Sequence, residues 1–398
     1  MSNLLNPNWI ESLPDNVVRN LEALNDYTVQ RICKTIGDIG TISASDAHRL
    51  KSVLEYAGAD LDAIQRELSR IMGMNAREIE TIFERVAAEN VDFANAYYKA
   101  RGMATLGGYT DSAALTSFVD AWKAAAADGA SNVAGTEMIG FKVGKRVVPL
   151  REYYIQTIDK AITFAQTGAI DYHTAVRQTV KDMARSGLRR VTFESDYSRR
   201  LDTQARMNIL DGIRNLNAQM MEQTGREFGA DGVEISAHAL CAPDHQDIQG
   251  RQYSIAEFER INRGLNRAIG DRHCHHFTTP IILGVSKPTY SAKELREINR
   301  KSNEKVTYTY TDRKGNKVEK TYTRYEASQK QRQYETAIRY AKDERDALKA
   351  AGDKLGATQA RKKSANLSAE YKRFCEKTGL TPRPERTRSM TGGTMQRA

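Results

Sequence analysis

The residues best suited to catalysis or metal binding lie between positions 238 and 276. This stretch holds five of the chain's seven histidines and two of its four cysteines. Imidazole and thiolate groups can bind a transition metal, transfer protons, or form hydrogen bonds inside a core. Three interpretations are therefore open for this segment: a metal site, an active site, and a structural core without turnover.

The first interpretation is a structural zinc site, in which thiolate and imidazole ligands form a closed tetrahedron. The spacings Cys-x3-His and Cys-x-His differ from the common zinc-finger arrangement. Zinc is the one cofactor that this pattern brings into consideration, and otherwise we expect none. The candidate ligands are His238, Cys241, His245, Cys274 and His276.

The second interpretation is a metal-dependent nuclease, in which a histidine activates water and a cation stabilises the scissile phosphate. The sequences "PDH" (243–245) and "HCHH" (273–276) supply suitable residue types. However, "EFERINRGLNRAIG" (257–270) between them is predicted to form one helix leading into a turn. Nuclease cores of this kind need a pair of short strands there, so the pattern argues against the nuclease.

The third interpretation is a structural core, in which buried His and Cys side chains hydrogen-bond to the backbone. Asp244 after Pro243 is typical of a turn or helix cap, and Gly250 allows a tight bend. We favour this interpretation and assign no catalytic residue. No phosphate-binding loop, strand-borne GxGxxG or nucleophile elbow occurs, which disfavours an ATP-driven motor.

The helix and strand patterns around these residues predict an α+β, predominantly α-helical fold. The length of the chain predicts more than one domain. We expect a helical N-terminal domain over 1–101 and a mostly helical middle region over 102–228. A central α+β domain with short strands should cover the His/Cys segment over 229–300. A β-hairpin and a basic helical C-terminal region should follow over 301–398.

Local signals define several elements within these regions. In the N-terminal region we expect a helix capped at Ser43 and ending at Gly58, a second near 60–72, and a third starting at Asn75. Together these would form helical hairpins of roughly 35 residues, a length that rests on the spacing of the helix signals.

Two β-hairpins are also predicted. The sequence "MIGFKVGKRVVPL" (138–150) is typical of two short strands that turn at Gly144. Alternating Val, Tyr and Thr over 306–325, with a turn at Lys-Gly-Asn, predict the second hairpin. Helices should dominate after it, with breaks at Gly352 and Gly379.

Composition narrows the cellular setting. The chain is 40% hydrophobic and 28% charged, which is typical of a globular protein. We expect no signal peptide, because the first residues lack a basic region and an apolar run. No apolar run is long enough to cross a bilayer, and the four scattered cysteines favour a reducing compartment.

Charge is distributed unevenly along the chain. Residues 281–398 hold 28 Lys and Arg against 14 Asp and Glu, whereas the first 280 residues hold 32 against 36. A basic end on a mildly acidic body favours contact with nucleic acid, although a solvated surface of mixed charge would look similar. Stacking and charge from the second hairpin could bind a strand, or its tyrosines could pack on a neighbour. The candidate nucleic-acid-binding residues are Lys305, Tyr308, Tyr310, Arg313, Lys314, Lys317, Lys320 and Tyr322.

Several segments resemble the minor capsid protein family of tailed bacteriophages and prophages, which is similar to the Mu F-like head morphogenesis proteins. They include "DGVEISAHALCAPDHQDIQGRQYS" (231–254), "DRHCHHFTTPIILGVS" (271–286) and the helical stretch 322–353. The N-terminal stretch 37–86 fits the same pattern, so the resemblance covers nearly the whole chain. The signature residues are Ser236, His238, Pro243, Asp244, His245, Gly250, Cys274 and His276.

The resemblance implies a non-enzymatic virion protein of the phage head, made in the bacterial cytoplasm. It also implies that portal and capsid proteins are partners, that the basic C-terminal region contacts phage DNA, and that no membrane is involved. The alternatives are a nuclease or processing factor within the head, and a DNA-binding protein injected with the genome. One position departs from the family, which often has Arg where this chain has His275.

Overall fold

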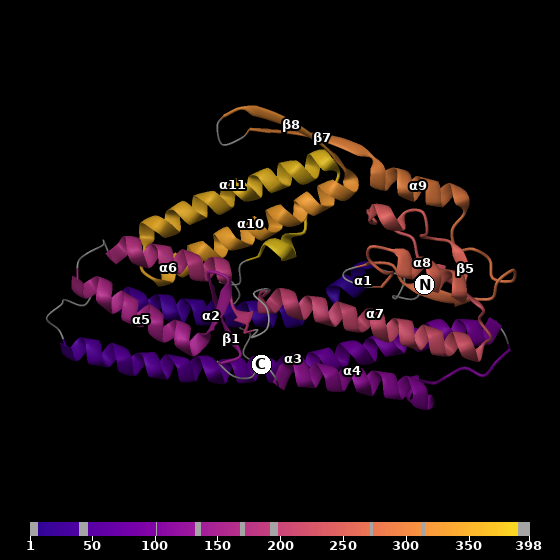
Figure 1. Cartoon of the computed structure of the whole chain (residues 1–398), viewed down its shortest axis with the longest axis horizontal. Helices are drawn as coiled ribbons and strands as arrows, with labels where there is room; N and C mark the ends of the chain where they lie inside the picture. Colours follow the sequence, from indigo (N-terminus) through magenta and orange to yellow (C-terminus); the bar gives the residue numbers. More distant parts are fainter. Residues whose placement is uncertain are drawn as a thin grey trace. The chain divides into compact units, whose positions relative to one another are not determined.

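The structure is a computed structural model of the chain, and it confirms the predominantly helical α+β class (Figure 1). Within the described residues no helix combines the length and the apolar character that crossing a bilayer requires. The residues that the structure describes are 7–39, 47–100, 102–131, 137–167, 172–191, 198–270, 274–311 and 315–388.

Helices account for most of the described residues. Among these residues, three short 3-10 helices also occur, at Tyr109–Asp111 (η2), Pro243–His245 (η3) and Pro384–Thr387 (η4). The α-helices are α1 (Pro7–Ser12), α2 (Asp15–Ile39), α3 (Ala47–Ala100), α4 (Ala113–Ser131), α5 (Leu150–Thr167), α6 (Tyr172–Ser186), α7 (Leu201–Glu227), α8 (Ile255–Gly264), α9 (Ala292–Asn303), α10 (Arg324–Ala350) and α11 (Lys354–Thr378).

In the part of the chain that the structure describes, the strands form three small antiparallel sheets, with the orders β2-β1-β3, β5-β4-β6 and β7-β8. Sheets of two or three short strands depend on helices and loops to cover them. The strands are β1 (Ile139–Val143), β2 (Arg146–Pro149), β3 (Arg189–Arg190), β4 (Gly232–Ile235), β5 (Gln252–Ser254), β6 (Thr278–Ile281), β7 (Lys305–Thr311) and β8 (Lys317–Thr323).

The chain folds into two compact units, each built from three separate stretches. Unit 1 contains Met1–Asn16, Ala76–Asp128 and Ala205–Gln329. Unit 2 contains Val17–Asn75, Gly129–Gln204 and Lys330–Ala398. Our division from the sequence used four consecutive segments, whereas both units combine stretches that lie far apart in the chain. Residues 229–300 lie wholly within unit 1.

The N-terminal region differs from the expected short helical hairpins. A single helix, α3, runs from Ala47 to Ala100 and passes through Gly58, so the predicted helix end there is wrong. Its buried Ile64, Leu68 and Ile82 continue one apolar stripe at helical spacing. Burial of this stripe outweighs the roughly 1 kcal/mol that an interior glycine costs.

The sequence also predicted helix starts at Asn75 and at Ser43, and the structure tests only the first of them. Asn75, where we expected a new helix, lies inside α3 and is buried. Its side-chain oxygen accepts a hydrogen bond from the Asn20 amide at 2.8 Å, so it joins α3 to α2 rather than capping a helix. The expected cap at Ser43 lies outside the described residues.

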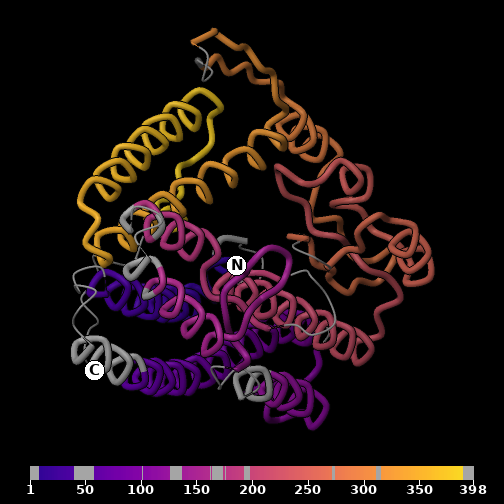
Figure 2. Tube along the Cα trace, turned by 60° about the vertical axis from the view of Figure 1, so that its left-hand side comes forward, coloured from indigo at the N-terminus to yellow at the C-terminus, as the bar shows by residue number. Residues whose placement is uncertain are grey.

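The strand pairs of both predicted hairpins and the helix breaks at Gly352 and Gly379 are confirmed, whereas the helix expected near 60–72 is part of α3. β1 and β2 pair around Gly144, which has a φ of +60°, and β7 pairs with β8 over seven residue pairs. α10 ends before Gly352, and α11 ends at Gly379 in the left-handed conformation. α10 and α11 lie side by side as a helical hairpin, as both views show (Figures 1 and 2). The ring of Tyr334 on α10 packs against that of Phe374 on α11.

A buried ion network joins three stretches of unit 2. Arg200 is 5% exposed, and its guanidinium lies 2.8 Å from a carboxylate oxygen of Asp343 and 3.4 Å from one of Asp202. Arg339 contacts Asp202 at 2.9 Å and Glu22 at 3.5 Å. Burial, followed by repulsion from Asp202, raises the pKa of Glu22 to about 7. The network therefore holds more carboxyl groups than its two cations neutralise.

Asp26 provides a test of this excess negative charge. Burial, followed by repulsion from Asp343, raises the pKa of Asp26 to about 7, from 3.8. The folded chain therefore keeps a proton that the unfolded chain has lost, so stability should fall as pH rises from about 4 to 7. We expect Asp26→Asn to flatten this decline and to raise the free energy of unfolding at pH 8 by about 1–3 kcal/mol.

Urea unfolding of the full chain between pH 5 and pH 8 measures the effect. The matched control is Asp62→Asn, because Asp62 is exposed on α3 of the same unit and should change stability little. An Asp26→Asn chain that is less stable than wild type at pH 8 would show that the ionised carboxylate is favourable where it lies.

Candidate functional site

The topology of the sheet β5-β4-β6 brings the two His/Cys segments together. β4 pairs antiparallel with β6, and Ile235 at the end of β4 lies opposite Thr278 at the start of β6. The segment that leaves β4, with Cys241, therefore runs beside the segment that enters β6, with Cys274 and His276. The single-turn helix η3 follows β4 and ends at His245.

Three of the predicted side chains converge on one point. The Cys274 Sγ atom lies 3.3 Å from His276 Nδ1 and 3.7 Å from His245 Nδ1. The candidate donor atoms of these three residues all lie within 4.8 Å of one another. The side chains are 0–2% exposed, so the cluster is almost completely removed from solvent. We call these residues, His245, Cys274 and His276, the His/Cys cluster.

Hydrogen bonds on the outer side of both rings determine their orientation. His245 Nε2 lies 2.7 Å from the carbonyl oxygen of Arg267, which can only accept a hydrogen bond. His276 Nε2 lies 3.1 Å from the side-chain oxygen of Gln249. Both rings therefore carry their proton on Nε2 and turn the lone pair of Nδ1 toward the sulfur of Cys274.

Gln249 is the residue that organises this environment, and sequence reasoning missed it. It is 1% exposed, its amide nitrogen donates to Asn299 Oδ1 at 2.6 Å, and its oxygen also accepts the backbone N–H of His238. The Asn299 amide in turn donates to the carbonyl of Gln246. This chain of donors and acceptors fixes which end of Gln249 faces His276. Only its position beside Gly250 in the signature block could have drawn attention to it.

Cys241 and His238, the other two candidate ligands, lie next to the cluster. Cys241 is buried, and its thiol donates to the carbonyl of Ala242. Burial and the nearby charge of Cys274 raise the pKa of Cys241 to about 12. The ring of His238 lies 4.3 Å from that of His276, and its Nε2 is buried without a hydrogen-bond partner among the described residues.

The environment also shifts the protonation of the cluster. Burial would raise the pKa of Cys274, but the contact with His245 and hydrogen bonds from two backbone N–H groups outweigh it and lower that pKa. Burial would lower the pKa of His245, but the contacts with Cys274 and the Arg267 carbonyl raise it. Burial and the neighbouring histidines lower the pKa of His276 to about 2, so this ring is neutral near pH 7.

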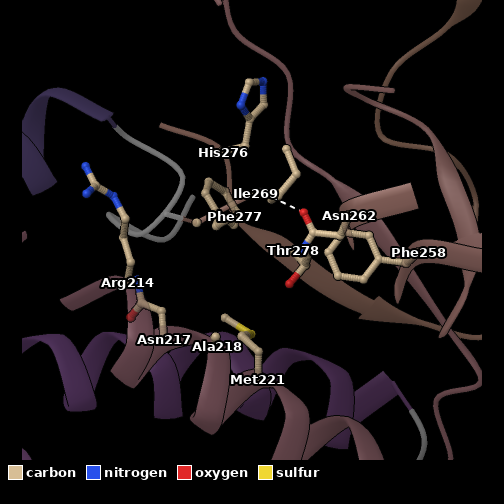
Figure 3. Close-up of a pocket in the computed structure, with 11 residues that line it drawn as sticks. Arg214, Asn217, Ala218, Met221, Phe258, Asn262, Ile269, His276, Phe277 and Thr278 are labelled. Atoms are coloured by element: carbon tan, nitrogen blue, oxygen red, sulfur yellow. Dashed lines mark hydrogen bonds between the residues drawn. The ribbon is translucent and has the colours of Figure 1, made fainter. Parts of the chain in front are cut away.

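A small pocket adjoins the cluster within unit 1. It has a volume of about 200 Å³ and lies between α7, α8 and the segment 276–278 (Figure 3). Met221 and Ala218 line it from α7, and Phe258 lines it from α8. His276 is the one cluster residue that reaches the pocket wall, and it is 2% exposed. The pocket therefore gives a substrate little access to the cluster.

Comparison with protein families identifies the chain. The model of the family described as phage minor capsid protein 2 matches residues 5–376, nearly the whole chain. The chain belongs to this family. No curated protein and no solved structure matches it. The protein is therefore a phage minor capsid protein with a structural role in the phage head, which places it in the virion.

The signature residues of this minor capsid protein mostly hold the backbone around the cluster. The Ser236 hydroxyl accepts the backbone N–H of Phe277, which joins the end of β4 to the start of β6. Pro243 begins η3, and the carboxylate of Asp244 lies 3.8 Å from His245 Nε2. At Gly250, φ is +69°, and a Cβ atom would lie only 2.2 Å from the side chain of Leu295 on α9. Glycine is therefore required there by both conformation and space.

His275 separates two residues of the cluster but does not belong to it. Its side chain is 27% exposed, and its Nδ1 lies 3.4 Å from Glu11 Oε1. His273, the remaining histidine of the segment, lies outside the described residues. His275 therefore lies against an acidic side chain and outside the His/Cys cluster.

The hairpin of the minor capsid protein buries two of the residues that were candidates for stacking on nucleic acid. Tyr308 is 4% exposed and Tyr322 is 8% exposed, so neither ring presents a free face. Lys305 and Lys317 are exposed, but strand alternation places them on the face opposite these tyrosines. Lys320 shares the tyrosine face and lies over the ring of Tyr322. Burial favours packing for Tyr308 and Tyr322, while Arg313 and Lys314 lie outside the described residues.

Proposed function

We propose that this minor capsid protein is a non-enzymatic component that works near the portal, in head assembly and in DNA packaging or delivery. The observation that carries the proposal is the family match over residues 5–376, together with three signature residues, His245, Cys274 and His276, that form a buried cluster. A protein in that position would contact the portal and capsid proteins, and its fold rather than a reaction would be its contribution.

The geometry of the His/Cys cluster supports the non-enzymatic part of the proposal. A general base or nucleophile must come within about 3 Å of the group on which it acts. His245, Cys274 and His276 are 0–2% exposed, and the outer nitrogen of each ring is engaged in a hydrogen bond. A substrate would have to displace these contacts before it reached the sulfur, so the arrangement is suited to bracing the fold.

Charge supports a contact with DNA. The region 281–398 holds twice as many basic as acidic residues, and Lys305, Lys317 and Lys320 are exposed on the hairpin. Such residues bind phosphates with release of counterions and need no sequence readout. Binding of this kind would weaken strongly with rising salt concentration, which distinguishes it from recognition of a specific DNA site.

Depletion of the chain from an infected or induced host tests the proposal. We expect the yield of DNA-filled heads to fall at least tenfold, counted by electron microscopy of lysates. Supply of the wild-type chain from a plasmid should restore the yield. Normal numbers of filled heads in the absence of the chain would overturn the proposal, as would cutting of a plasmid by the purified chain and Mg²⁺ that His245→Ala abolishes.

A further inference from the structure

We propose that His245, Cys274 and His276 bind a Zn²⁺ ion, and that Cys241 completes the tetrahedron. The ion would stabilise the fold of the module around the cluster and would take no part in a reaction. This proposal is separate from the proposed function of the chain in the phage head. Four features of the described residues carry the inference: the separations of the donor atoms, the supply of protons, the outer hydrogen-bond partners of the rings, and the small apolar core around them.

The separations between donor atoms match those of a tetrahedral zinc site. With Zn–S near 2.3 Å and Zn–N near 2.0–2.1 Å, a sulfur and a nitrogen bound to the same ion lie about 3.5–3.6 Å apart. The observed distances from Cys274 Sγ to His276 Nδ1 and His245 Nδ1 are 3.3 and 3.7 Å, on either side of this value. An ion could therefore be bound with shifts of a few tenths of an ångström.

Proton counting leads to the same conclusion. Both imidazoles carry a proton on Nε2, so both Nδ1 atoms turn a lone pair toward one sulfur. A thiol has a single proton and can donate to only one of them. A thiolate paired with a protonated His245 satisfies that ring but still leaves the lone pair of His276 without a donor. A cation bound to all three atoms satisfies every group at once.

The surroundings resemble the outer shell of a metal site. Ligating histidines commonly donate their second N–H to a carbonyl or amide oxygen, which fixes the ring and increases its basicity. Arg267 and Gln249 supply these acceptors here. Cys241 is 2% exposed and is the other described thiol of this module, on the segment between β4 and η3. It lies outside the group of three converging donors, so its side chain would shift toward the ion to supply the fourth ligand and close the site to water.

The module around the cluster buries few apolar side chains of its own. Within the described residues of 229–303, the buried apolar side chains are Ile235, Cys241, Ala242, Cys274 and Ile281. α8 buries none of its residues, and α9 buries only Ser302. Small modules with so little apolar burial commonly depend on a disulfide or a metal, and all described cysteines are free thiols. A zinc ion would supply this cross-link.

Metal analysis of the full-length chain tests the proposal. The chain should be produced without a histidine tag in medium that contains zinc, and purified without chelator. We expect about one equivalent of zinc by mass spectrometry for wild type and less than a tenth of that for Cys274→Ala. Cys33→Ala, which removes a buried thiol in unit 2, is the matched control and should retain the metal.

Spectroscopy of the wild-type chain keeps the test independent of variants that fail to fold. Replacement of the metal by Co²⁺ should produce an intense thiolate-to-cobalt band and the visible bands of a tetrahedral ion. A strong chelator should lower the melting temperature of wild type and leave that of Cys274→Ala unchanged. Folded wild-type chain that takes up no zinc even when ZnCl₂ is added would overturn the proposal.

The fourth ligand is tested separately. We expect Cys241→Ala to lose the metal or to bind it at least tenfold more weakly, and to weaken the thiolate-to-cobalt band. His238→Ala should keep full occupancy, although the buried Nε2 of His238 is the competing donor. Loss of zinc from His238→Ala with retention in Cys241→Ala would overturn the assignment of Cys241.

Discussion

Replacement of Arg200 by methionine is expected to destabilise unit 2 by about 3–5 kcal/mol. The guanidinium is 5% exposed and lies against the carboxylates of Asp202 and Asp343. Removal of one member of a buried ion pair leaves the other charge without compensation in a medium that solvates it poorly. Arg339 still pairs with Asp202, so Asp343 should account for most of the loss.

Urea unfolding of the full chain at pH 7 measures this effect. Arg70→Met is the matched control, because Arg70 pairs with Glu67 on the exposed side of α3 and should cost less than about 1 kcal/mol. The double variant Arg200→Met with Asp343→Leu should recover part of the stability, since it removes the orphaned carboxylate. If Arg200→Met is as stable as Arg70→Met, the buried network does not hold unit 2 together.

Gln249→Met should have the second largest effect, again about 3–5 kcal/mol, but in unit 1. Methionine has a similar volume, and it leaves the His276 Nε2–H, the backbone N–H of His238 and the oxygen of Asn299 without their partner. Each buried polar group that loses its partner costs about 1–3 kcal/mol. The change should also free the ring of His276 to rotate.

Hydrogen exchange followed by mass spectrometry can locate the effect. We expect faster exchange in peptides from β4 through β6, with unit 2 unchanged. Gln246→Met is the matched control, because the Gln246 side chain bonds to Asn303 at the surface of the same module. Equal protection in the Gln249 and Gln246 variants would mean that the hydrogen bonds of Gln249 contribute little to the fold.

The sequence predicted those parts of the fold that depend on local signals. The hairpin β7-β8 follows from alternating Tyr and Thr around a Gly-Asn turn, and the ends of α10 and α11 follow from Gly352 and Gly379. The continuity of α3 through Gly58 could not be predicted, because tertiary burial of its apolar stripe decides it. The composition of the two units depends on contacts between distant stretches, which a single sequence does not reveal.

The candidate site was predicted by residue type but not by geometry. The five candidate ligands were named from their spacing, whereas only antiparallel pairing of β4 with β6 selects Cys274, His245 and His276 as one cluster. The acceptor on Gln249 could not be found from the sequence, because its role depends on Asn299, fifty residues away. The buried network around Arg200 was missed for the same reason, since Asp343 lies 143 residues further along the chain.

The most direct test of the central claim, that this minor capsid protein is a structural part of the head, is an asymmetric cryo-EM reconstruction of intact particles. The account predicts ordered density for the chain inside the head near the portal, with α3 and α7 recognisable as long helices. Complete, DNA-filled heads that contain no trace of the chain would contradict it.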